Sequence, residues 1–151
     1  GLTGEPRAWV EAAGAGGGVE CGILEGPDGA PQASVRAESR LVGDYDFDDF
    51  DAKYRDAATE LECPADLPAP VTAALQELAK QAFVAMDCSG LARVDFFVGD
   101  DGSLTINEIN TMPGFTPSSM FPLMWAAQGV DYPELVDRLI ATALRRGTGL
   151  R

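Results

Sequence analysis

The sequence predicts an α+β fold in which helices cover an antiparallel sheet. Two stretches rich in β-forming residues, Leu91–Val98 and Ser103–Asn110, are separated by the turn sequence Gly-Asp-Asp-Gly. A second pair, Val19–Glu25 and Gln32–Glu38, is separated by Gly-Pro-Asp-Gly, which is also a strong turn signal. Short turns join antiparallel neighbours, so each pair is expected to form a β-hairpin. A further short strand is expected at Trp9–Ala13.

Three later stretches, at about residues 71–86, 120–128 and 133–146, are expected to be helices. Apolar residues spaced by three and four predict one buried stripe on the first helix, made by Val71, Leu75, Leu78, Ala82 and Met86. The last helix shows a similar face, made by Leu135, Val136, Leu139, Ile140, Ala143 and Leu144. The last two helices are expected to cover one side of the sheet, and Ser118 or Ser119 to cap the first of these two.

The charge balance limits the classes of partner. The 151 residues include 11 basic and 24 acidic side chains, for a net charge of -13. Nucleic acids and anionic membrane surfaces attract basic patches, so neither is an expected partner. The sequence shows neither an apolar run of about 18 residues nor a signal peptide. These features together predict a cytoplasmic protein.

Cysteine and histidine usage narrows the chemistry. Cys21, Cys63 and Cys88 are odd in number and widely spaced, which predicts reduced thiols and neither a disulfide framework nor a zinc site. The chain has no His, which excludes nucleophile–histidine schemes and histidine-bound zinc for this chain alone. Its chemistry must rely on carboxylates, Arg, Lys, hydroxyl groups, the backbone and metal ions.

The hairpin of residues 91–110 gathers polar side chains. Alternation along a strand places Arg93 and Asp95 on one face of its first strand. Glu108 and Asn110 share a face of the second strand, on which alternation also places Leu104 and Ile106. If the loop that joins the two strands has an even number of residues, the residue numbers of two directly opposite residues sum to 201 or 203. Each odd-numbered residue of the first strand then lies opposite an even-numbered residue of the second. Arg93, Asp95, Glu108 and Asn110 are therefore expected on one face.

Two carboxylates and an amide oxygen form a ligand set that suits a hard cation such as Mg²⁺. A cation with open positions can also bind phosphate oxygens, so the cluster predicts a phosphate-handling metal site. The alternative is a solvated hairpin face with an ordinary Arg–acid pair. Apolar residues on both strands imply burial, and two buried acids beside one Arg leave a negative charge that needs a partner. Burial therefore favours the metal site.

The segments Arg93-Val94-Asp95 and Asn107–Thr116, NEINTMPGFT, resemble the C-terminal signature of D-alanine–D-alanine ligases in the ATP-grasp superfamily. Asp51-Ala52-Lys53-Tyr54 resembles the E-A-K-Y element of the family's substrate-closing loop. The resemblance runs from about Val10 to the end. It implies that residues 1–151 form the C-terminal half of an ATP-grasp domain, and that the N-terminal half with its glycine-rich loop is missing.

The resemblance also implies roles for particular residues. The ligands of two Mg²⁺ (or Mn²⁺) ions that bridge the ATP phosphates would be Asp95, Glu108 and Asn110. The oxyanion would be held by Arg93 and the backbone N–H of Gly114. The second substrate would be bound near Lys53, Tyr54, Ser119 and Met120. The adenine-binding hinge would include Glu11, Ala12 and Gly14. The chain departs from the family at Gly18, where a Glu usually binds the ribose hydroxyls.

The implied activity is the ATP-dependent joining of two D-alanines, through an acyl phosphate, for peptidoglycan precursors. The implied complete enzyme is a homodimer that uses ATP and D-alanine. Three alternatives stay open: a ligase making D-alanyl-D-lactate or D-alanyl-D-serine, another ATP-grasp carboxylate-amine ligase, and a non-catalytic remnant or binding fragment.

Overall fold

A computed structural model of the chain describes residues 18–41 and 59–146. The elements in chain order are β1 (Gly18–Glu25), β2 (Pro31–Leu41), β3 (Thr59–Glu62), α2 (Ala69–Ala85), β4 (Leu91–Val98), β5 (Leu104–Asn110), α3 (Met120–Ala126) and α4 (Tyr132–Arg146). The strands form a five-stranded sheet in the order β3-β2-β1-β4-β5, and all neighbours are antiparallel. This arrangement confirms the predicted α+β class.

Both hairpins and all three helices occur where the sequence predicts them, with ends that differ by a few residues. The first hairpin turns through Gly26–Ala30, where Gly29 has a φ of 82° that favours glycine. The short strand β3 was not predicted, and the strand expected at Trp9–Ala13 lies outside the described residues. Within the described ranges, no helix has the length and apolarity that crossing a membrane requires.

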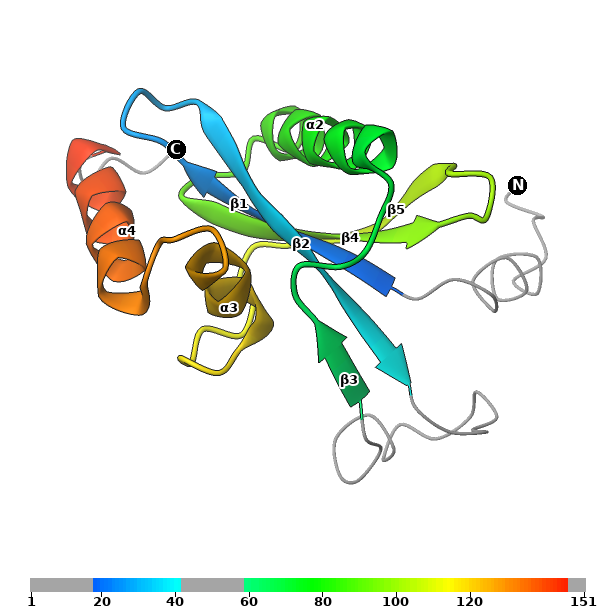
Figure 1. Ribbon diagram of the computed structural model, residues 1–151. Helices are drawn as coiled ribbons and strands as arrows, with labels where there is room; N and C mark the ends of the chain where they lie inside the picture. The colour runs from blue at the N-terminus through cyan, green and yellow to red at the C-terminus, as the bar shows by residue number, and fades with distance from the viewer. Residues whose placement is uncertain (1–17, 42–58, 147–151) are drawn as a thin grey trace, which may run out of the picture.

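The sheet has a hydrophobic core on each face. Helix α2 covers one face, while α3 and α4 lie on the other (Figure 1). The core under α2 consists of Val19, Cys21, Ile23, Leu75, Ala79, Phe83, Ala92, Val94 and Phe96. The core under α3 and α4 consists of Leu24, Ala37, Phe121, Met124, Trp125, Val130 and Leu135. The prediction that the last two helices share one side is therefore confirmed.

The predicted apolar stripes on the helices are only partly correct. On α2 the buried residues are Leu75, Ala79 and Phe83, a row spaced by four, whereas Met86 is 66% exposed. Met86 is the C-cap, so it lies where the helix ends and leaves the sheet. On α4, Leu135 is buried but Ile140 and Leu144 are 53% and 78% exposed. Each helix is thus buried along a narrower stripe than its composition suggests.

A glycine in β1 sets how closely α3 approaches the sheet. A Cβ atom on Gly22 would lie 3.0 Å from Trp125 Nε1 and 3.1 Å from Phe121 Cε2. It would also lie 3.1 Å from Ser34 Oγ, which accepts a hydrogen bond of 2.9 Å from the Gly22 backbone N–H. Since these neighbours are buried side chains, a Cβ atom at residue 22 would require them to move by a few tenths of an ångström.

We therefore expect Gly22→Ala to destabilise the fold by about 1–3 kcal/mol, because the added methyl group forces α3 outward or the neighbouring side chains off their rotamers. Gly18→Ala in the same strand is the matched control, since its Cβ would meet nothing within 4 Å. Urea unfolding of both variants measures the difference. Equal stability of the two would contradict this account of the α3 contact.

Candidate functional site

The second hairpin brings four predicted site residues to one face of the sheet. Arg93 lies directly opposite Asn110, and Asp95 lies directly opposite Glu108. Directly opposite residues in an antiparallel pair project to the same side. The prediction that these four side chains share one face is therefore confirmed. The apolar part of the same face, which includes Leu91, packs under α3 and α4.

The loop length and the strand register that bring these four residues to one face differ from the predicted ones. The loop runs from Gly99 to Ser103, an odd number of residues, and pairs Val98 with Leu104 and Phe96 with Ile106. A β-bulge then leaves Asn107 without an opposite residue. The expectation that Leu104 and Ile106 share the face of Glu108 is thus wrong. Both pack against the core under α2, and the bulge reverses the alternation between Ile106 and Glu108.

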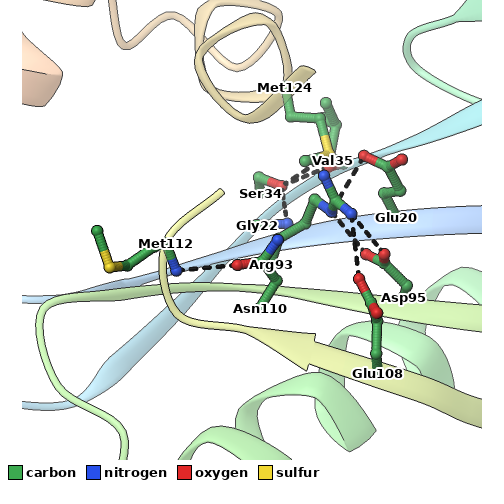
Figure 2. Close-up of polar contacts among 10 residues, drawn as sticks. All are labelled: Glu20, Gly22, Ser34, Val35, Arg93, Asp95, Glu108, Asn110, Met112 and Met124. Atoms are coloured by element: carbon green, nitrogen blue, oxygen red, sulfur yellow. Dashed lines mark hydrogen bonds and ion pairs between the residues drawn. The ribbon is translucent and has the colours of Figure 1, made fainter. Parts of the chain in front are cut away.

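Arg93 is the centre of the polar cluster. Its Nε donates to Asp95 Oδ1 at 2.7 Å and its Nη2 to Asp95 Oδ2 at 2.6 Å, a bidentate ion pair. The same Nη2 lies 3.5 Å from Glu108 Oε1 (Figure 2). The pKa of Arg93 is raised, first by its hydrogen bonds to Asp95 and then by the surrounding negative charges, although burial opposes the shift.

Glu20 is a further member of the cluster that the sequence did not reveal. It lies directly opposite Asp95 across the β1–β4 pair, and its Oε2 is 3.4 Å from Arg93 Nε. Its side chain is only 16% exposed, and its buried Oε2 has no hydrogen-bond partner among the residues that the structure describes. Burial is the main reason that the pKa of Glu20 is raised. The positive charge of Arg93 opposes this shift, and the charges of Asp95 and Glu108 add to it.

The sequence contains a weak signal for Glu20. Val19, Cys21 and Ile23 alternate as apolar residues, so Glu20 must project from the opposite face of the strand. What the sequence does not show is that β1 lies beside β4, a contact between strands about 70 residues apart along the chain. Without this neighbour relation, an acid in β1 cannot be assigned to the site.

The cluster carries an excess of negative charge. Glu20, Asp95 and Glu108 lie side by side on three adjacent strands, and among the described side chains Arg93 is the cation in contact with them. Three carboxyl groups of the described chain therefore share one guanidinium. In the described part of the chain, no group of three or more Asp, Glu, Cys or His side chains is already arranged as a metal site. The oxygen donors, and the surplus of carboxyl groups over cations among the described residues, nevertheless fit a hard cation.

The loop that follows β5 is fixed to the body of the protein at several points. Asn110 Oδ1 accepts a hydrogen bond of 2.9 Å from the Met112 backbone N–H, which sets the orientation of the amide. The Phe115 carbonyl accepts a hydrogen bond of 2.8 Å from the Tyr132 hydroxyl, and the Phe115 ring contacts the rings of Phe121 and Tyr132. The loop is thereby held at the start of α3.

Gly114 and Ser119 lie together within this loop. A Cβ atom on Gly114 would be 3.1 Å from Ser119 Oγ, so a glycine permits the close approach. Ser119 is the N-cap of α3, as expected, but its hydroxyl does not cap the helix. It accepts the Thr116 backbone N–H at 3.0 Å instead. Met120 packs against the core under α3 and α4.

Five predicted site residues lie outside the described part of the chain. These are Glu11, Ala12, Gly14, Lys53 and Tyr54. The three cysteines, which lie within it, are free thiols, as predicted. The Cys21 thiol is fully buried, and this burial raises its pKa to about 12.

The sequence of the whole region matches a known family. Residues 2–141 match the family described as "D-ala D-ala ligase C-terminus". The chain belongs to this family. It is 58% identical over 153 residues to a D-alanine–D-alanine ligase from Kineococcus radiotolerans, and 55% identical over 150 residues to one from Mycobacterium bovis. Each alignment covers 97% of this chain and 40% of the relative, so the chain spans well under half the length of these curated proteins.

Solved structures of family members have the same fold. The D-alanine–D-alanine ligase from Coxiella burnetii matches with a TM-score of 0.71 and 39% identity, over 87% of this chain and 32% of that one. The VanG D-Ala:D-Ser ligase from Enterococcus faecalis gives a TM-score of 0.71 and 31% identity, over 84% and 36%. A Bacillus anthracis D-alanine–D-alanine ligase complexed with ATP gives 0.68 and 29%, over 87% and 39%.

The bidentate geometry of Arg93 leads to a prediction about stability. Arg93→Lys keeps the charge but removes the planar fork, so we expect the free energy of unfolding to fall by about 1–3 kcal/mol. The control is Arg138→Lys in the exposed i,i+4 pair with Glu134, where we expect a loss below about 0.5 kcal/mol. Guanidinium chloride unfolding compares the two. Equal losses would show that the Arg93 fork has no special role in stability.

Proposed function

We propose that this chain forms the cation-binding and oxyanion-binding side of an ATP-dependent D-alanine–D-alanine ligase of the ATP-grasp type. The observation that carries the proposal is the placement of Arg93, Asp95, Glu108 and Asn110 on one face, directly opposite one another across β4 and β5. Family membership and 55–58% identity to two named D-alanine–D-alanine ligases support it.

Asp95, Glu108 and the amide oxygen of Asn110 are the proposed ligands of two Mg²⁺ or Mn²⁺ ions. Such ions would neutralise the charge of the ATP phosphates during phosphoryl transfer. The chain supports this chemistry by supplying oxygen donors, an excess of negative charge and a rigid two-stranded base. The use of ATP is further supported by the ATP complex of the Bacillus anthracis ligase.

In the proposed reaction, a carboxylate oxygen of the first D-alanine attacks the γ-phosphorus of ATP, which forms an acyl phosphate and releases ADP. The amine of the second D-alanine then attacks the acyl carbon, and phosphate leaves as the peptide bond forms and the amine loses a proton. Arg93 and the Gly114 N–H are the proposed donors to the oxyanion. Donors of this kind contribute about 3 kcal/mol each.

The second D-alanine is proposed to bind at the loop before α3. Its carboxylate would lie near Ser119 and Met120, and Lys53 and Tyr54 would close over it. The adenine would lie at Glu11, Ala12 and Gly14. The close approach of Gly114 to Ser119 supports a single compact site for the oxyanion and the second substrate, because a Cβ atom on Gly114 would be only 3.1 Å from Ser119 Oγ.

A second substrate other than D-alanine is the main competing proposal. The match to the VanG D-Ala:D-Ser ligase favours D-serine as a candidate, at 31% identity. The relatives from Kineococcus radiotolerans and Mycobacterium bovis, at 58% and 55% identity, are both named D-alanine–D-alanine ligases, and this favours D-alanine. The test measures ADP release with D-alanine alone, with D-alanine plus D-serine and with D-alanine plus D-lactate. Analysis of the product in each case shows which second substrate is joined. A remnant without catalytic function would release no ADP with any of these in the complete protein.

The proposed setting is the cytoplasm, where ATP is available and thiols stay reduced. The free cysteines of the described chain are compatible with such a compartment. The proposed product serves peptidoglycan precursor synthesis. The proposed complete enzyme adds an N-terminal half with a glycine-rich loop and forms a homodimer.

We expect Glu108→Gln in the complete ligase to lower turnover by about 100-fold while it changes stability by less than about 0.5 kcal/mol, because it removes a charged cation ligand from an exposed position. Glu134→Gln is the control, since the exposures of the two side chains are similar, 53% and 48%. Phosphate release across a Mg²⁺ range, beside a thermal melt, makes the comparison. Near-normal turnover of Glu108→Gln at ordinary Mg²⁺ would exclude Glu108 as a ligand.

We also expect this chain alone to show no measurable D-alanine-dependent ADP production. Without a glycine-rich cover and the phosphate-binding lysines of the other half, the site could neither exclude water from an acyl phosphate nor orient three reactants. Orientation contributes roughly 7–11 kcal/mol where it is fully achieved. The assay compares the purified chain with and without an added N-terminal half from a complete ligase. Robust activity without the addition would contradict this expectation.

A further inference from the structure

We propose that Glu20 is a positioning residue: it holds the Arg93 guanidinium when a cation draws Asp95 and Glu108 away from it. The inference rests on the proposed role of Asp95 and Glu108 as cation ligands. It assigns a role to a carboxylate in β1, a strand that contributes none of the proposed ligands or oxyanion donors.

Arg93 and a cation compete for the same oxygen atoms. Both Asp95 oxygens accept hydrogen bonds from Arg93, at 2.7 and 2.6 Å, and Glu108 Oε1 lies 3.5 Å from the same guanidinium. A cation that binds Asp95 and Glu108 uses these oxygens and repels the guanidinium. Arg93 must therefore exchange its partner if it is to stay beside the reacting atoms as an ordered donor.

Glu20 is placed to be the new partner. Of the three carboxylates in contact with Arg93, it is the one outside the proposed ligand set. Its Oε2 lies 3.4 Å from Arg93 Nε, is inaccessible to solvent and has no hydrogen-bond partner in residues 18–41 and 59–146. A small movement of the guanidinium would give this oxygen a hydrogen bond. A buried acceptor that lacks a hydrogen bond is costly, so the exchange satisfies Glu20 at the moment when Arg93 loses Asp95.

The exchange has a geometric basis in the sheet. Glu20 lies opposite Asp95 on one side and Glu108 lies opposite Asp95 on the other, so the three acids form a row across β1, β4 and β5. Figure 2 shows the guanidinium between carboxylates from all three strands. A cation at the β4–β5 end of this row leaves the β1 end for Arg93. The metal cation and the Arg93 guanidinium can then each bind carboxylates of the row without contacting one another.

The test observes Arg93 directly, by solvent exchange of its Nε–H in ¹⁵N NMR spectra of the chain, without and with saturating MgCl₂ at constant ionic strength. In the wild-type chain we expect the Nε–H to be protected in both conditions. In Glu20→Gln we expect protection without Mg²⁺, where Asp95 holds the group, and exchange about tenfold faster with Mg²⁺, because one charge-assisted hydrogen bond is lost. Glu20→Asp, which keeps the charge, should restore part of the protection.

The matched control is Glu25→Gln in the same strand, since the Glu25 side chain is 15% exposed and pairs with Arg145 and Arg146 at the far end of β1. It should leave the exchange rate of the Arg93 Nε–H as in the wild type.

Two results would overturn the role of Glu20 alone. In the first, Mg²⁺ leaves the exchange rate of the Arg93 Nε–H in Glu20→Gln unchanged. In the second, this rate exceeds that of the wild type by the same factor without and with Mg²⁺. Backbone signals of residues 95 and 108 that do not shift with Mg²⁺ would overturn the cation site and this inference together. If Glu20→Gln does not fold, the same comparison is made with Glu20→Asp, which should exchange faster than the wild type only with Mg²⁺.

Discussion

The bidentate ion pair between Arg93 and Asp95 is the interaction on which the rest of the site depends. It allows three carboxylates to lie side by side on adjacent strands, an arrangement that would otherwise place like charges directly opposite one another. Within the described ranges, one guanidinium serves three carboxyl groups, so the row is compact but rich in acidic groups. The proposed binding of Mg²⁺ and phosphate requires such a row, because the carboxylates must be held together before the cation binds and must still offer it negative charge.

The backbone of the sheet reconciles this polar row with two hydrophobic cores. The bulge at Asn107 lets Ile106 point into the core under α2 while Glu108 points to the site, although strict alternation would place both on one face. On the site face, Gly22 lets α3 lie close to β1, so apolar packing covers the region around Leu24 and Leu91. Since Gly22 is directly opposite Arg93, the apolar packing under α3 adjoins the charged row.

The sequence predicts local structure well and relations between distant strands poorly. The hairpins and helices follow from turn residues and apolar spacing, and the shared face of Arg93 and Asp95 follows from strand alternation. The shared face of all four residues, which include Glu108 and Asn110, was predicted correctly from a loop of the wrong length. The unexpected bulge offset the error in loop length.

Glu20 was missed because its role depends on the β1–β4 contact, which no local pattern encodes. The narrow buried stripes of α2 and α4 depend likewise on how each helix meets the sheet. The roles of Gly114, Ser119 and Met120 were implied only by resemblance to the family and stay predictions, as do those of Lys53 and Tyr54.

The central claim is that the face shared by β4 and β5 binds divalent cations through Asp95, Glu108 and Asn110. The most direct measurement is a crystal structure of the chain soaked in MnCl₂, with Mn²⁺ located by its anomalous scattering. The account predicts an anomalous peak within coordination distance of both carboxylates, with the Asp95–Arg93 fork opened. An ordered β4–β5 hairpin with that fork intact and no peak beside it, at Mn²⁺ concentrations that occupy other sites, would contradict the account.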